Sequence, residues 1–169
     1  HPIDRNNTYL LYLKDWRGIN IDISQFSIDL FNFLRPDDHN LKCAVTEKEQ
    51  IVKIFFQKEL SQLSTIDEEQ AKKVFQGKIK SKEIKAYTLD QIIKKSEYFD
   101  REIDLLDIDV EGADYRVLLG LNFKKYKPKL ICVEIHNKNI KDDKIYKFLI
   151  DKGYTLIWSN IFSHLFKIG

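Results

Sequence analysis

Short apolar runs alternate along the chain with amphipathic stretches, as expected when strands and helices follow one another. Continuous or β-branched apolar runs predict strands at 18–23, 41–46, 51–56, 84–87, 103–109 and 129–135. Apolar residues three or four positions apart predict helices over 7–15, 24–34, 88–95, 111–119 and 141–152. Two last apolar runs, 154–158 and 163–168, predict a C-terminal hairpin.

Capping signals mark several of the expected helix ends. The residues suited to these roles are Ser24, the capping-box pairs Thr88 with Gln91 and Thr65 with Glu68, and the C-terminal glycines Gly120 and Gly153. The Thr65 pair predicts a short helix at 66–75 inside residues 60–82, a charged and polar segment. We therefore expect one domain over 1–169, with 60–82 as an insertion or lid.

The alternation of strands and helices predicts an α/β fold. Strands that are apolar throughout are typical of a mostly parallel sheet that is covered on both faces. In such sheets, ligands bind at the carboxyl ends of the strands. Chemistry-bearing residues at strand ends are therefore the candidate site.

Composition narrows the possible partners. The 43% of hydrophobic and 32% of charged residues argue against disorder, and a net charge of +2 with few arginines does not favour nucleic-acid binding. No apolar run reaches the ~18 residues of a membrane-spanning helix. We expect a cytoplasmic protein with no membrane or nucleic-acid partner.

Acidic residues end three of the predicted strands. Asp22 ends the first, where nucleotide-binding folds place an acid on ribose hydroxyls, although it could instead cap the following helix. Asp107, Asp109 and Glu111 occupy alternate positions of the run IDLLDIDVEG, and Glu111 could equally be a helix-start acid.

The next strand ends in the run VEIHN. Glu134 and His136 alternate and so share a face, and a glutamate inside an apolar strand is costly unless it is paired or functional. His136 could act as a base near neutral pH, or it could be an ordinary packed or surface histidine.

Three blocks of the sequence resemble the FkbM family of S-adenosylmethionine-dependent methyltransferases. They are NNTYLLYLKDWRGINIDIS (6–24), LRPDDHNLKCAVT (34–46) and IDLLDIDVEGADYRVLLGLNFKKYKPKLICVEIH (103–136). The resemblance implies a Rossmann-like class I methyltransferase sheet, with the C-terminal hairpin as its antiparallel part. It also implies a first strand, central in the sheet, and a glycine-containing turn that would precede His1 and are missing here. The chain alone is then expected to be unstable and to bind cofactor poorly.

The same resemblance assigns roles to individual residues. It implies O-methylation of a glycan or small natural product, by in-line attack of a hydroxyl on the methyl group. Asp109, Glu111 and His136 are then the catalytic candidates. The implied cofactor contacts are Asp22 on the ribose, Ile23, Asp38, Ala44 and Val45 around the adenine, and Asn7 and Thr8 at the methionine end. No metal ligand is assigned, although Asp109, Glu111 and Glu134 could supply oxygen ligands.

Two other functions fit the same residues. An inactive methyltransferase-like domain could bind a partner without the cofactor. An NAD-binding Rossmann protein would also place an acid at Asp22, although the hairpin and the IDVEG block argue against it. The acceptor and the oligomeric state do not follow from the sequence.

Overall fold

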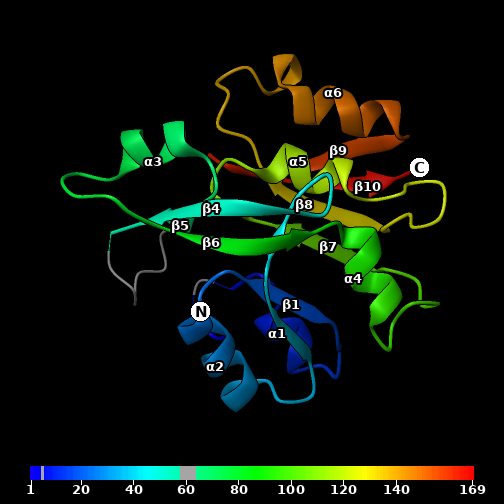
Figure 1. The fold of residues 1–169 in the computed structure, drawn as a ribbon. Coiled ribbons are helices and arrows are strands. Elements are labelled where there is room, and N and C mark those ends of the chain that lie inside the picture. Colours follow the sequence, from blue (N-terminus) through cyan, green and yellow to red (C-terminus); the bar gives the residue numbers. More distant parts are fainter. Residues whose placement is uncertain (5, 58–63) are drawn as a thin grey trace.

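The N-terminal part of the chain forms a small parallel β-α-β unit. The computed structural model describes residues 1–4, 6–57 and 64–169. The elements of this unit are α1 (Tyr9–Tyr12), β1 (Ile19–Asp22), α2 (Gln25–Leu34) and β2 (His39–Lys42) (Figure 1). Strands β1 and β2 pair in parallel from Ile19 opposite His39 to Asp22 opposite Lys42. The predicted strand–helix–strand order is therefore confirmed here.

A second sheet is built on a long antiparallel pair. Its elements are β3 (Ala44–Val45), β4 (Gln50–Phe56), β5 (Ser64–Thr65), α3 (Glu68–Val74), β6 (Lys80–Tyr87) and α4 (Leu89–Lys95), with strand order β3-β6-β4-β5. Strand β6 begins at Lys80, not at 84, because it continues the β4 ladder as far as Phe56. It therefore runs into the predicted insertion 60–82, of which residues 60–63 lie outside the described residues.

The C-terminal half forms a four-stranded sheet. Its elements are β7 (Leu105–Ile108), α5 (Asp114–Leu119), β8 (Leu130–Glu134), the short 3₁₀ helix η1 (Ile140–Asp142), α6 (Lys144–Asp151), β9 (Tyr154–Ser159) and β10 (Ser163–Ile168). The strand order is β7-β8-β10-β9, so β10 returns antiparallel between β8 and β9. This arrangement confirms the predicted hairpin.

The expectation of one mostly parallel sheet is wrong for the described residues. Their strands form three sheets, and four of the seven strand pairings are antiparallel. The predicted strand 41–46 splits at Cys43, because β2 follows β1 whereas β3 pairs with the end of β6. Strands β1 and β7, which the family resemblance places on either side of a further strand, do not pair with each other.

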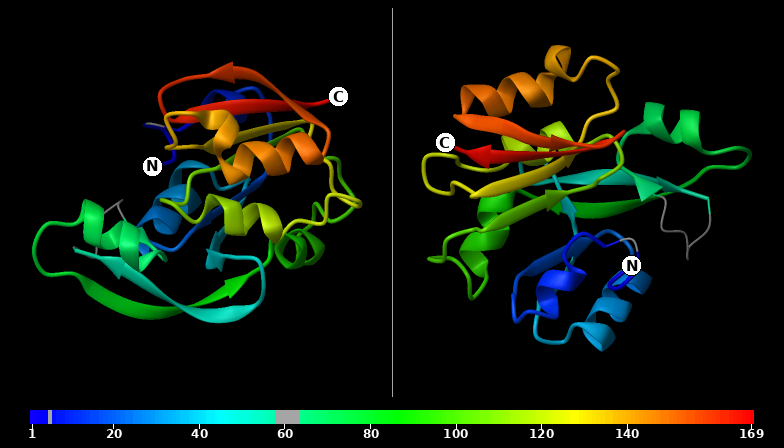
Figure 2. Two further views of the ribbon diagram at one scale, coloured as in Figure 1. Left: turned by 90° about the horizontal axis from the view of Figure 1, so that it is seen from above. Right: turned by 180° about the vertical axis from the view of Figure 1, so that it is seen from behind.

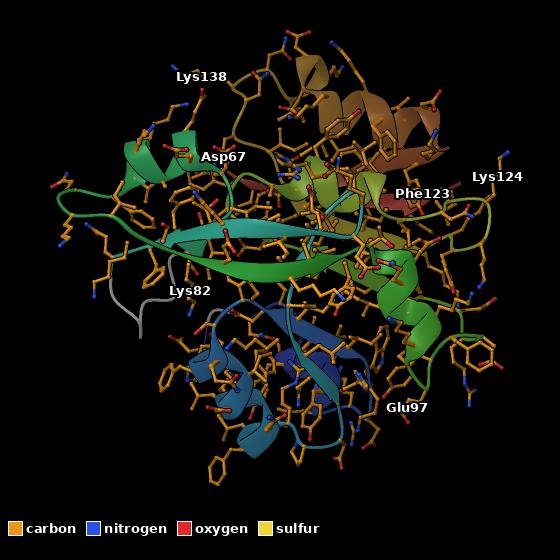
Figure 3. The ribbon with its side chains drawn as sticks, viewed as in Figure 1. Asp67, Lys82, Glu97, Phe123, Lys124 and Lys138 are labelled. Atoms are coloured by element: carbon orange, nitrogen blue, oxygen red, sulfur yellow. The ribbon has the colours of Figure 1, made fainter. Side chains whose placement is uncertain are left out.

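The main core lies on one face of the C-terminal sheet. Helices α5 and α6 cover that face, while α1, α2 and β1 lie on the other side (Figures 1 and 2). Ile108, Ile131, Val133 and Phe166 point into this core with Leu149 of α6. The ring of Phe123, which Figure 3 labels, packs edge-on against Phe148 and Tyr154. Since side chains alternate along a strand, the neighbouring positions face the N-terminal unit.

Three of the predicted helix ends are confirmed. The Ser24 hydroxyl accepts from the Ser27 amide, and Thr88 with Gln91 forms a complete capping box. Gly153 follows α6 with a φ of +86°, the left-handed conformation that glycine adopts without strain.

Two other end signals are wrong, and Gly120 follows the last residue of α5 as predicted but without the left-handed conformation. Helix α3 is capped by Asp67, whose side chain accepts from the Gln70 amide (Figure 3), and not by Thr65. Helix α5 begins at Asp114 instead of Glu111, because the chain first makes a turn. A Cβ atom at Gly120 would lie 2.5 Å from the Thr46 carbonyl oxygen, so close packing explains this glycine.

Candidate active site

Asp107 and Asp109 lie at the carboxyl end of β7, on the face of the sheet that is turned away from α5 and α6. They alternate with Ile108, which is buried in the core on the opposite face. The Asn7 side-chain amide donates to Asp107 Oδ1 at 3.1 Å, and it lies 4.0 Å from the Cys132 sulfur. The N-terminal segment is thereby joined to the strands that carry the acids, and the role of Asn7 at the methionine end stays a prediction.

Glu111 lies in the turn between β7 and α5. Its φ is +53°, and that of Gly112 is +94°, so both residues adopt left-handed backbone conformations. The buried carboxylate of Asp114 accepts from the amides of Val110 and Gly112, at 3.4 and 3.2 Å. Glu111 therefore leaves the strand through a turn and does not continue the alternation of Asp107 and Asp109.

Glu134 and His136 form a pair at the end of β8. His136 Nε2 lies 3.3 Å from Glu134 Oε2, and the Phe162 ring packs at 5.1 Å from the imidazole. The backbone amide of Ile135 donates to the Phe162 carbonyl at 2.9 Å, which brings the tip of the hairpin to the site. A carboxylate in this position can orient the imidazole.

Three carboxyl groups of this region, those of Asp109, Glu111 and Glu134, have raised pKa values. Partial desolvation raises the pKa of Asp109, and the charge of Asp107 raises it further. Desolvation and then Asp109 raise the pKa of Glu111, and the same two causes bring the pKa of Glu134 to about 7. A group whose pKa lies near 7 can exchange a proton at neutral pH.

Asp22 lies at the end of β1, half-buried. Its Oδ1 atom accepts from the Ser24 amide at 2.7 Å, and burial raises its pKa. The Asp22 charge is the smallest of the causes that raise the pKa of Asp109. The Cys43 amide donates to the Asp22 carbonyl at 3.2 Å, which places Ala44 and Val45 beside the strand end that continues into Ile23.

Asp38 belongs to a different network, in which its own side chain and that of Arg35 are buried. Its Oδ2 accepts from Arg35 Nε at 2.8 Å and from the Asn20 amide at 2.9 Å, and its Oδ1 accepts from the Gly18 amide at 2.9 Å. Arg35 also donates to the Thr8 hydroxyl at 2.9 Å. Through these hydrogen bonds, Arg35 and Asp38 join Thr8, which precedes α1, to the β1–β2 pair. The adenine contact of Asp38 and the methionine contact of Thr8 stay predictions.

Sequence reasoning missed three residues of this region, Arg35, Thr65 and Asp114. Glycine and aspartate both favour turns, so the Gly112–Ala113–Asp114 run could have identified Asp114 as a turn residue. Among the residues that the structure describes, no group of three or more His, Cys, Asp or Glu is arranged to hold a metal ion. Likewise, no helix in the described part of the chain combines the length and apolar character that a membrane span requires.

The raised pKa values predict an unusual pH dependence of stability. Asp114 has a pKa of about 6 because of burial, above its unfolded value near 4, so the folded chain holds a proton that the unfolded chain releases. This contribution to stability is complete below pH 4 and is lost as the pH rises through 6. Between pH 8 and pH 5 it should increase the free energy of unfolding by about 1–2 kcal/mol.

Thermal melting of the chain and of Asp114→Asn across this range measures the effect. The melting temperature of the unaltered chain should rise relative to that of the variant as the pH is lowered from 8 to 5. Parallel curves for the two proteins would show that Asp114 has an ordinary pKa.

Comparison with known proteins identifies one family. A family model described as a methyltransferase FkbM domain matches residues 2–156. No curated protein and no solved structure matches the chain.

Proposed function

Since the chain belongs to the methyltransferase FkbM domain family, we propose that it transfers a methyl group from S-adenosylmethionine to a hydroxyl group of a glycan or small natural product. The family match over 2–156 carries the proposal. It is supported by the arrangement of acids at the ends of β1, β7 and β8, where α/β folds bind their ligands.

The residues at the end of β1 fit the cofactor. Asp22 is a half-buried carboxylate whose Oδ1 accepts from the Ser24 amide, and its Oδ2 would accept a ribose hydroxyl. Ile23, Ala44 and Val45 offer apolar surface to the adenine on either side of that strand end. When bound, S-adenosylmethionine supplies an electrophilic methyl group on a sulfonium sulfur.

The ends of β7 and β8 would handle the acceptor. Asp109 keeps an exposed surface and could accept the proton of the acceptor hydroxyl. His136, oriented by Glu134 at 3.3 Å, is the second candidate base. Glu111, one turn further along the chain, would position the hydroxyl. Most of the rate acceleration would come from holding the acceptor in line with the methyl group.

Replacement of Asp22 tests the cofactor assignment. Asp22→Ala should weaken the binding of S-adenosylhomocysteine by about 1.5–3 kcal/mol, or roughly 10- to 150-fold, because charge-assisted hydrogen bonds to the ribose are lost. Isothermal titration calorimetry measures the dissociation constants.

A matched variant separates this role from simple helix capping. Asp143 caps α6 and accepts from the amide two residues ahead at 2.8 Å, as Asp22 does at 2.7 Å. Asp143→Ala should therefore lower the melting temperature and leave the dissociation constant unchanged. Equal affinities for Asp22→Ala and the unaltered chain would show that Asp22 acts only as a cap.

A further inference from the structure

The turn that carries Glu111 is held from the side of α5. Left-handed conformations are costly for a residue with a side chain, so the surroundings must enforce the φ of +53° at Glu111. Asp114 does so through the amides of Val110 and Gly112. The carbonyl of Glu111 itself is left for a donor from elsewhere.

Thr65 supplies that donor from a distant part of the chain. Its hydroxyl donates to the Glu111 carbonyl at 2.8 Å and accepts from the Asp67 amide at 3.0 Å, and its side chain is almost fully buried. Thr65 is fixed by strand β5, where it pairs with Phe55 of β4.

Helix α3 continues this contact with the turn. A small cavity between α3 and the turn is lined by Ser64, Thr65, Gln70, Val74, Phe75 and Glu111. A Cβ atom at Gly112 would lie 3.5 Å from the Gln70 side chain, so Gly112 also lies against α3. The segment 64–75 is therefore built against the acidic turn.

We propose that Thr65 is a positioning residue of the acidic site, which fixes the left-handed turn through the Glu111 carbonyl and so sets the direction of the Glu111 side chain. Thr65 and Asp114 then hold the turn from opposite sides. A role of the Glu111 side chain in catalysis rests on the proposed methyl transfer. The direction of that side chain can be measured without cofactor or acceptor, so the two proposals can fail separately.

The test compares variants that keep or remove the hydroxyl. Thr65→Val retains the shape of the side chain without the donor, and Thr65→Ser retains the donor. Ser96→Ala is the matched control, because the buried Ser96 hydroxyl also donates to a carbonyl at 2.8 Å and accepts an amide at 3.1 Å. Ser96 lies at the end of α4. Helix α3, which follows Thr65 in the sequence, lies at the opposite end of the β4–β6 pair (Figures 1 and 2).

Two NMR measurements report on the turn. The carboxyl ¹³C resonance of Glu111, identified by its loss in Glu111→Gln, gives the pKa of that group, which partial burial and Asp109 raise. In Thr65→Val this pKa should fall toward the ordinary value of ~4.3. The Gly112 amide should also exchange with solvent roughly 10-fold faster. Thr65→Ser and Ser96→Ala should match the unaltered chain in both.

Other results would overturn the proposal. If Thr65→Val and Ser96→Ala gave the same Glu111 pKa and the same Gly112 exchange, Thr65 would be no more than a packed threonine. Should Thr65→Val fail to fold, a measurement on the unaltered chain tests for the hydrogen bond directly. In mixed H₂O and D₂O, the Glu111 carbonyl carbon should show an isotope shift from the Thr65 hydroxyl in addition to that from the Gly112 amide, and a shift from the amide alone would exclude the contact.

Discussion

Replacing Asp109 by Asn should lower the turnover of methyl transfer by roughly 10²- to 10⁴-fold, the range typical for loss of a general base. The affinity for S-adenosylhomocysteine should change little, because Asp109 lies at the end of β7 whereas Asp22 lies at the end of β1. His136→Ala should show the same split between turnover and affinity. The assay follows radiolabelled methyl groups into whichever compound of a hydroxylated panel the unaltered chain methylates fastest.

Asp104 provides the matched control for this result. It immediately precedes β7, at the amino end of the strand, and binds Lys129 at 2.8 Å on the surface. Asp104→Asn should leave turnover unchanged. If Asp109→Asn instead abolished cofactor binding and left the turnover per bound cofactor normal, the ends of β7 and β8 would not be the acceptor side. Loss of activity on addition of EDTA would indicate a metal ion.

Breaking the buried ion pair between Arg35 and Asp38 should cause the largest loss of stability. Asp38→Asn should lower the free energy of unfolding by about 3–5 kcal/mol, because it leaves the buried guanidinium without its counter-charge. That is a large part of the ~5–15 kcal/mol of an ordinary domain. Urea unfolding, followed by circular dichroism, gives the free energy in the absence of any ligand.

A second substitution and a surface pair sharpen this test. Combining Arg35→Met with Asp38→Asn should cost less than the sum of the two single variants, because no unpaired charge is left behind. Glu68→Gln removes an exposed ion pair with Lys72 and should leave the urea midpoint unchanged. A free energy for Asp38→Asn that equals that of the unaltered chain would show that Asp38 is free to serve the cofactor.

Local signals predicted the elements well because they depend on near neighbours. The caps at Ser24, Thr88 and Gly153 require only residues within one helical turn. The hairpin of β9 and β10 is likewise a local pairing of two apolar runs. These are the parts of the fold that the chain determines over short distances.

Pairings between distant segments were not predictable in the same way. The length of β6 depends on its ladder with β4, and the break at Cys43 arises because β2 pairs with β1 whereas β3 pairs with β6. Apolar runs in the sequence indicate which segments can form strands. Which strands pair with one another depends on the packing of the whole structure. For this reason one mostly parallel sheet was expected where three sheets are found.

The candidate site shows the same division. The alternation of Asp107 with Asp109 and of Glu134 with His136 follows from strand periodicity. The conformation of Glu111 does not, because it depends on Thr65, which is 46 positions away in the sequence. Asp38 and Arg35 are only three positions apart in the sequence, but the sequence does not show that they form a pair. The burial of both side chains in the folded chain identifies the ion pair as structural.

A comparison of ligands by thermal melting tests the central claim, that this chain binds S-adenosylmethionine as a methyl donor. At 100 times its dissociation constant, even a weakly bound ligand of the folded state adds ~2.7 kcal/mol, which is roughly 5–10 °C for a chain of this size. S-adenosylmethionine and S-adenosylhomocysteine should both give such a shift, smaller in Asp22→Ala, and NAD should give none. A shift with NAD alone, or no shift with any of the three, would contradict the claim.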